Sequence, residues 1–217
     1  MKTNPFNDGW LFLIGQTEDH ASSGVGPLLV VLFLVLVVGS VAIAYLNWRD
    51  DPNQRTPAHL ATWFMRAMIG CMWFQGSIWK LPLPVSGGFK GWTTEMVQNA
   101  AFSAHGALVE AVYLPLLHII DPIVYLTELS MATALLLGFL VRPLAVVGML
   151  FVVHLWLGLY KHPAEWPWLY IFLVFVQGFF LLNNAGRSLG LDAWLARRPW
   201  GPFKGDGLIA RVYRGVG

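Results

Sequence analysis

Residues 27–46 form an apolar run without a charged side chain, and this run constrains the fold more than any other feature of the sequence. A helix of this length spans the roughly 30 Å hydrocarbon core of a bilayer. The run is not typical of a cleaved signal peptide, because a polar segment over 1–26 precedes it, with acidic residues such as Asp8 and Glu18. Arg49 follows soon after the run, where a cleavage site would carry small residues. We therefore expect 27–46 to be a retained anchor helix.

The composition indicates that lipid solvates much of the remaining chain as well. Of the 217 residues, 56% are hydrophobic and 12% are charged, and the charged share is about half that of a typical soluble domain. Four further apolar segments suit membrane crossings, at residues 61–80, 122–140, 143–160 and 166–184. We predict an all-α integral membrane protein with five crossings.

The apolar stretch from Gly106 to Val141 is too long for one crossing. Pro122 favours the first turn of a helix, and the residue before a proline resists helical conformation, so we expect the third crossing to begin at Pro122. The preceding 81–120 then forms an extramembrane or re-entrant insertion. We expect a short helix near 92–104 and a re-entrant or interfacial helix over 106–120 within it.

The basic residues are distributed unequally between the two ends of the predicted crossings. Five crossings with the C-terminal tail 185–217 inside place ten basic residues on the cytoplasmic side and four outside, as the positive-inside rule requires. The ten are Arg49, Arg55, Arg66, Arg142, Arg187, Arg197, Arg198, Lys204, Arg211 and Arg214, and the four are Lys2, Lys80, Lys90 and Lys161. We expect a multi-pass protein of a bacterial-type cytoplasmic membrane, with the N-terminus outside and the basic tail in the cytoplasm.

Polar residues inside the apolar segments are candidates for function, because an ionisable group at membrane depth costs about 2.5 to 3.5 kcal/mol on insertion scales. Counting residues along the helices places Glu128, His154 and Gln75 in one layer near the outer face. Arg66 and Gln177 fall in a second layer, nearer the cytoplasm. Such residues grip a ligand or move protons, but they also join helices as packing contacts. Arg66 is equally compatible with snorkelling to lipid phosphates, and Lys80 with anchoring at the interface.

Several kinds of site are excluded or disfavoured. Cys71 is the only cysteine, so the chain forms no intrachain disulfide, no dithiol centre and no thiolate zinc site. We find no nucleotide-binding fingerprint, nucleophile elbow or metal-ligand spacing. His118 and His154 show no pairing signature for haem. We therefore expect no metal or haem, and no nucleic-acid partner.

Three segments together resemble the DoxX family of small membrane proteins, and within it the DoxD-like subunit of thiosulfate:quinone oxidoreductase. The first is RAMIGCMWFQGSIWKL, with Arg66 and Lys80. The second is TELSMATALLLGFLVRP, with Glu128, and the third is the ending GFFLLNNAGRSLGLDAWL, with Ser188 and Asp192. The resemblance covers 61–195 and implies a four-helix core over 61–184, to which the 27–46 helix is added.

The resemblance implies a membrane subunit of a redox complex that transfers electrons to a quinone, which would be its cofactor. In that role Glu128 and His154 would move protons, and Gln75 or Trp156 would donate a hydrogen bond to a quinone carbonyl. A non-catalytic accessory subunit of a larger respiratory or photosynthetic assembly is the alternative, since the added helix, the insertion and the tail all offer surface for partners. Both hypotheses predict other protein subunits as partners, in addition to the lipid bilayer. A small-solute transporter is a weaker third hypothesis, because no internal repeat is evident.

Overall fold

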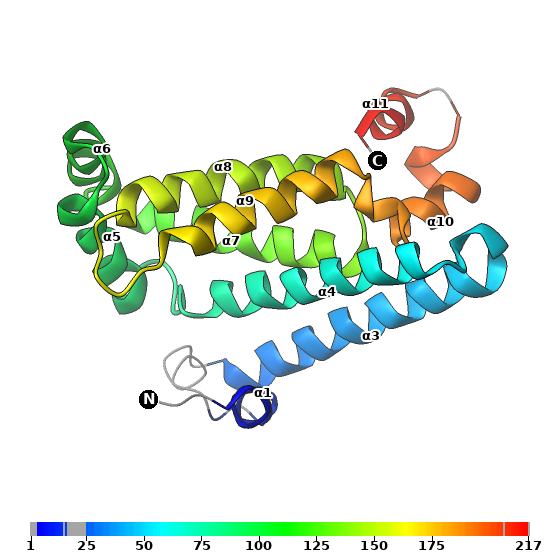
Figure 1. The fold of residues 1–217 in the computed structure, drawn as a ribbon, viewed down its shortest axis with the longest axis horizontal. Helices are drawn as coiled ribbons and strands as arrows, with labels where there is room; N and C mark the ends of the chain where they lie inside the picture. The colour runs from blue at the N-terminus through cyan, green and yellow to red at the C-terminus, as the bar shows by residue number, and fades with distance from the viewer. Residues whose placement is uncertain (1–3, 15, 17–24, 206, 217) are drawn as a thin grey trace. The chain divides into compact units, whose positions relative to one another are not determined.

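The computed structural model describes residues 4–14, 16, 25–205 and 207–216, and within them the chain folds into ten α-helices without any strand (Figure 1). The α-helices are α1 (Pro5–Leu13), α3 (Gly26–Asp50), α4 (Pro57–Ile78), α5 (Gly87–Asn99), α6 (Ser103–Leu108), α7 (Leu117–Leu137), α8 (Val141–Leu159), α9 (Pro167–Leu182), α10 (Leu191–Arg197) and α11 (Leu208–Val216). Short 3-10 turns occupy η1 (Pro52–Gln54), η3 (Ala185–Arg187) and η4 (Gly201–Phe203), and η2 (Val109–Tyr113) is a π-helix.

The chain divides into two compact units. Unit 1 takes residues 1–35, 74–129 and 157–162, and unit 2 takes residues 36–73, 130–156 and 163–217. The long helices α3, α4, α7 and α8 each give part of their length to one unit and part to the other.

Three helices, α3, α7 and α8, are long and apolar enough to cross a membrane, which indicates a multi-pass membrane protein. Helix α9 is apolar but has only 16 residues, about 24 Å at a rise of 1.5 Å per residue. Helix α4 has 22 residues but is less apolar than the three candidate spans. The all-α fold and the membrane class are thus as predicted, whereas three of the five predicted crossings meet both requirements.

Apolar side chains are exposed in stripes along these helices. On α9 the exposed residues are Phe172, Phe175, Phe179 and Leu182, three or four positions apart. On α3, exposed Leu28, Val31 and Val35 in unit 1 and exposed Val38, Val41 and Tyr45 in unit 2 follow the same spacing. Such stripes are unfavourable in water and are normal where lipid tails are the solvent. The stripe on α9 indicates that this helix also faces lipid, although it is shorter than the three candidate spans.

Helix α7 begins at Leu117 rather than at the predicted Pro122, which lies inside the helix. Proline lacks one backbone donor, and so close to the helix start the loss concerns a single hydrogen bond. The helix is already formed before it, because Ile120 N–H donates to Leu116 O at 2.9 Å. The residues predicted as the end of an interfacial helix are therefore the first turn of α7.

In unit 1 the insertion is folded into α5, α6 and the π-helix η2. Met96, Val109 and Leu159 form a buried apolar cluster there. Backbone bonds attach the segment to the end of α8, since Ala101 N–H donates to Leu157 O at 2.8 Å. The segment is therefore an ordered, helical part of the protein.

In unit 2 small residues let the long helices approach closely. A Cβ on Gly70 of α4 would lie 2.9 Å from Leu136 Cγ of α7, and one on Gly39 of α3 would lie 3.3 Å from Leu137. Trp63 of α4 also donates from its indole nitrogen to Ser40 Oγ of α3 at 3.2 Å. Close approach at small residues is the usual means of packing helices in lipid.

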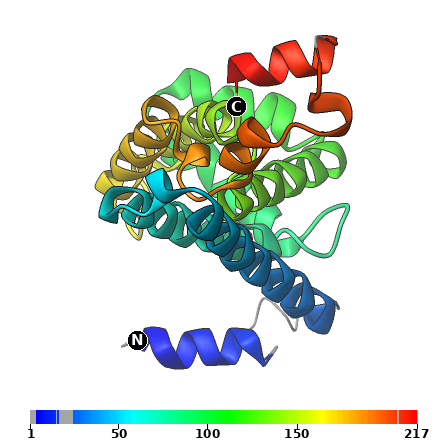
Figure 2. The ribbon, with the colours of Figure 1, turned by 90° about the vertical axis from the view of Figure 1, so that its right-hand side faces the viewer.

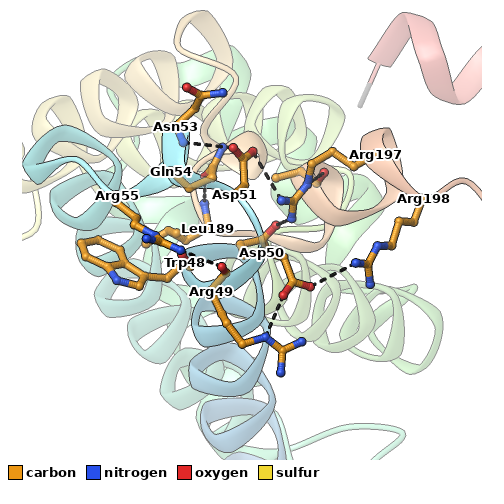
Figure 3. Close-up of polar contacts among 12 residues, drawn as sticks. Trp48, Arg49, Asp50, Asp51, Asn53, Gln54, Arg55, Leu189, Arg197 and Arg198 are labelled. Carbon is orange, nitrogen blue, oxygen red and sulfur yellow. Dashed lines mark hydrogen bonds and ion pairs between the residues drawn. The ribbon is translucent and has the colours of Figure 1, made fainter.

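The connection from α3 to α4 is fastened by hydrogen bonds (Figure 3). Arg55 donates to Trp48 O at 2.7 Å and to Arg49 O at 2.8 Å, which satisfies carbonyls in the last turn of α3. Asp51 accepts from Asn53 N–H at 3.0 Å and caps the intervening 3-10 turn. The link is thus short, and it is held by hydrogen bonds to the end of α3 and within the 3-10 turn.

Candidate functional site

Four residues of unit 1 form a buried polar group, which we call the Lys80 cluster: Lys80, Ser86, Asp121 and Glu128. Lys80 follows the last turn of α4, Ser86 is the N-cap of α5, and Asp121 and Glu128 lie on α7. The two α7 residues are seven apart and so share one face of that helix. The chain reversal after α4 brings the ammonium to this face.

Lys80 and Glu128 form an ion pair shielded from solvent. The lysine is 2% exposed and the glutamate 3%. Lys80 Nζ donates to Glu128 Oε2 and also to Gly76 O at 2.7 Å, and it lies 3.9 Å from the centre of the Trp79 ring. Removing two charges from water costs several kcal/mol each, and their attraction offsets this only with good geometry. This pair is therefore unlike an exposed surface salt bridge, which contributes little.

Asp121 adds a second carboxyl group that is fully buried. Its Oδ2 accepts from Ser86 N–H at 2.7 Å, and it interacts electrostatically with Lys80 and Glu128. Its Oδ1 has no hydrogen-bond partner among the described residues. Two buried carboxyl groups therefore accompany one ammonium group, which is ion-paired with Glu128. This gives the cluster the composition of a proton-exchanging site.

Ser86 fixes the loop that joins α4 to α5. Its Oγ accepts from Phe89 N–H at 3.0 Å, as an N-cap does, and donates to Trp79 O at 3.0 Å. Gly88 lies against the Trp79 ring, where an added Cβ would come within 3.2 Å. The loop that carries Lys80 is therefore held by backbone contacts on both sides.

A second buried polar group lies in unit 2, and we call it the Arg66 cluster: Asn47, Gln54, Arg66, Ser188 and Asp192. Arg66 is fully buried and donates to Leu135 O at 2.6 Å, to Leu136 O at 3.5 Å and to Ser188 O at 3.2 Å. It joins the last turn of α7 to the segment before α10. The guanidinium thus satisfies backbone carbonyls, not lipid phosphates.

The other members of the Arg66 cluster also bond to backbone groups. Asn47 donates to Gly190 O at 2.9 Å, and Gln54 accepts from Leu189 N–H at 2.8 Å (Figure 3). Gly138 has φ +70° and Gly190 lies against it, so that a Cβ on either would meet backbone atoms of the other. The glycine-rich ending of the resemblance is therefore a docking element for the chain itself.

Asp192 closes this cluster at the turn between α7 and α8. Its Oδ1 accepts from Leu140 N–H at 3.1 Å and from the Tyr213 hydroxyl at 2.8 Å. Burial raises the pKa of the Asp192 carboxyl, and the hydrogen bonds from Tyr213 and the backbone offset part of this rise. Burial and the adjacent carboxyl also raise the pKa of the Tyr213 hydroxyl. The aspartate therefore serves as a fixed acceptor.

Ion pairs continue from this cluster to the surface of unit 2. Arg197 donates to Asn47 Oδ1 and lies 3.4 Å from Asp51 Oδ2, and Arg198 lies 3.4 Å from Asp50 Oδ2 (Figure 3). Arg197 ends α10 and Arg198 comes directly after it, whereas Asp50 ends α3 and Asp51 comes directly after it. At least five of the ten basic residues counted for orientation are thus engaged within the chain, namely Arg49, Arg55, Arg66, Arg197 and Arg198.

The residues predicted from sequence separate into different surroundings. Lys80, which the sequence left as either a functional candidate or an interfacial anchor, is the partner of Glu128. Gln75 is exposed, so its expected position facing the bundle is not found. His154 lies half-buried on the part of α8 that belongs to unit 2. Exposure does not test depth along a helix, so the shared layer of Glu128, His154 and Gln75 stays a prediction, as does a role for His154.

Gln177 is fully buried on α9, as expected for a residue that faces other helices. Neither its amide nitrogen nor its amide oxygen has a hydrogen-bond partner among the described residues. The amide packs on Gly148 of α8, where a Cβ would lie 2.5 Å from its nitrogen and 3.1 Å from Met131 Sδ. The side chain is thus closely packed, and it bonds to neither cluster.

Asp121 and Ser86 are the functional candidates that sequence reasoning missed. Asp121 served only as a boundary before Pro122, although an aspartate within an apolar segment is itself a signal. Ser86 carried no signal, because its role depends on a backbone N–H. In the described ranges no three His, Cys, Asp or Glu side chains are grouped to hold a metal ion.

Comparison with known proteins identifies no relative. No family model matches the chain, and neither does any curated protein or solved structure.

Proposed function

We propose that the chain is a membrane subunit of a quinone-associated redox complex and that the Lys80 cluster handles its protons. The buried pair of Lys80 and Glu128, with the unpaired oxygen of Asp121 beside it, is the observation that carries the proposal. The resemblance to DoxD-like subunits supports it, since Lys80 and Glu128 both lie in the segments that carry that resemblance.

The chemistry follows from what the cluster offers. Reduction of a quinone to a quinol takes up two electrons and two protons. Electrons would come from a partner subunit, and this chain would supply protons. Lys80 would donate a hydrogen bond to a quinone oxygen, whose negative charge grows on reduction, and the carboxyl groups of Glu128 and Asp121 would pass protons to it.

The proposal includes the topology expected from the sequence. In it, α4, α7, α8 and α9 form a DoxX-like four-helix core with α3 added, and the N-terminus lies outside. The excess of basic residues toward the tail supports this orientation. The exposed apolar stripe on α9 supports a fourth lipid-facing helix beyond the three candidate spans.

Replacing Glu128 tests the proposal most directly. In the assembled complex, Glu128→Gln should lower quinone reduction by about 10²-fold or more, the usual contribution of a positioned proton donor. Asp121→Asn should lower it less and shift its pH profile. Glu110→Gln, at an exposed carboxyl on η2 in the same unit, is the matched control and should leave the rate unchanged. An unchanged rate in Glu128→Gln with normal assembly would refute the proton role.

An accessory, non-catalytic subunit remains the second candidate, and the Arg66 cluster favours it. Arg66 and Gln54 of that cluster bond to backbone groups, which is the property of a scaffold. This candidate predicts that the Glu128 variant still supports quinone reduction and that loss of the chain disassembles its complex. The same variant therefore separates the two candidates.

A further inference from the structure

The last helix, α11, exposes an apolar face although it lies beyond every candidate span. Leu208 is 74% exposed, and Ile209 and Val212 are each 57% exposed. Successive residues of a helix turn by about 100°, so these three side chains fall within an arc of roughly 100°. Exposed apolar side chains on one arc of a short helix are typical of a surface that is covered in the working protein.

The opposite side of α11 is fixed to unit 2. Ala210 is fully buried and Tyr213 is 6% exposed. The Tyr213 hydroxyl donates to Asp192, and its ring stacks on Phe139 with 6.1 Å between ring centres and lies tilted against Phe203 with 4.8 Å. The helix is thus held in one orientation, and its apolar arc is a defined surface. Figure 2 shows α11 as the red helix at the C-terminal end of the ribbon.

Phe139 determines the depth of this helix relative to a bilayer. It lies in the tight turn between α7 and α8, which are both long and apolar enough to span. A turn between two spans lies at the membrane interface, because the hydrocarbon core offers no partners for its free backbone groups. A helix stacked on that turn lies at the same level, within reach of headgroups and upper acyl chains.

The charge around α11 suits an anionic surface. Beyond Arg197 and Arg198, which are paired with Asp51 and Asp50, residues 199–217 contain three basic residues and a single acidic one, Asp206. Arg211 is exposed and lies on α11 beside the apolar arc, about 60° from Leu208. An apolar arc bordered by basic residues is the pattern of helices that lie in the interface plane of anionic membranes.

We propose that α11 is an interfacial helix that inserts Leu208, Ile209 and Val212 into the anionic leaflet at the α7–α8 end of unit 2. The leaflet, rather than a protein partner, covers the apolar arc, because the Phe139 stack places the helix at interface depth. Arg211 then reaches the phosphates of the same leaflet. The tail is a second, peripheral membrane contact in addition to the spans.

The test uses the full-length chain with Cys71→Ser, so that one introduced cysteine carries a fluorophore. Val212→Cys samples the apolar arc. Gly207→Cys is its control, because this exposed position lies about 100° from Leu208 on the side away from the arc and has open space for a side chain. Both are reconstituted in phosphatidylcholine vesicles with and without one quarter phosphatidylglycerol. Doxyl-labelled lipids quench a label in acyl chains, and iodide quenches a label in water.

With phosphatidylglycerol present, we expect doxyl quenching to be at least twofold stronger at 212 than at 207, and iodide quenching to show the reverse order. Ile209→Cys should behave as Val212→Cys. Equal iodide quenching at 207 and 212 would mean that the arc faces water, and protection of 212 from both quenchers would mean that protein covers it. Either result overturns the proposal, and an unchanged pattern without phosphatidylglycerol overturns its anionic part. Chains that elute with the parent on size exclusion exclude misfolding as the cause.

Discussion

The two buried polar clusters stabilise their charged groups with different kinds of partner. Both remove charge from water, but Arg66 bonds to backbone carbonyls at 2.6 and 3.2 Å, whereas Lys80 is paired mainly with a carboxylate. Backbone acceptors cannot change their charge, so the contacts of Arg66 have one state. Glu128 and Asp121 can take up or release a proton, so the Lys80 cluster has several. A buried charge therefore indicates scaffold or chemistry according to what it contacts.

The largest expected effect is on the Arg66 cluster. Arg66→Met leaves the carbonyls of Leu135 and Ser188 unpaired and should lower the free energy of unfolding by about 3–5 kcal/mol. Arg66→Lys should lose nearly as much stability as Arg66→Met, because one ammonium group cannot bond to both segments as a guanidinium group does. Thermal unfolding in detergent, followed by size exclusion, measures this.

Arg198→Met is the control for Arg66, since its side chain is largely exposed and its ion pair with Asp50 spans 3.4 Å. Arg198→Met should lower the free energy of unfolding by less than about 1 kcal/mol. If Arg66→Met is as mild as this control, the contrast between the two clusters fails.

An intermediate effect is expected at the Lys80 cluster. Lys80→Met should cost about 2–4 kcal/mol, less than the loss of Arg66, because the abandoned Glu128 can become neutral by taking a proton. The double variant Lys80→Met/Glu128→Leu should return stability to within about 1 kcal/mol of the parent, as replacement of a whole buried pair often does.

The double variant also sharpens the comparison. A stable chain that no longer supports quinone reduction assigns the pair to chemistry, and a stable chain with full reduction assigns it to packing. The reading requires that the double variant assembles as the parent does, which co-purification of the partner subunits measures.

The smallest effect is expected where a polar group belongs to neither cluster. Gly148→Ala places a methyl group against the Gln177 amide and Met131, and overpacking of this kind should cost about 1–3 kcal/mol. Gly178→Ala is the matched control on α9, where the nearest atom would lie 4.0 Å away and little change is expected. Melting temperatures of the two variants, compared in one detergent, decide whether the packing around Gln177 is as close as the structure indicates.

Apolar length predicted the long helices well, because a run such as 27–46 has only one stable conformation in lipid. Their ends were less predictable, and α7 begins five residues early because one proline near a helix start removes only one bond. Glu128 and Arg66 were found because a charge in an apolar segment is conspicuous. The pairing of Lys80 with Glu128 was not predicted, since the two residues are 48 positions apart and only the tertiary structure brings them together.

Helical phase explains the failure at Gln75. Residue counting gives depth along a helix but not direction around it, and Gln75 lies on the exposed side next to buried Phe74. Asp121 was missed for a related reason, because its role depends on the backbone N–H of Ser86.

The closed link between α3 and α4 bears on how the protein is made. Because Arg55 ties the last turn of α3 to the start of the next helix, the two segments are suited to enter the membrane together as a hairpin. In the proposed topology α4, which is less apolar than the candidate spans, would be carried in by the strongly apolar α3. The appended helix would then act during biosynthesis as an insertion partner for the segment that carries Arg66.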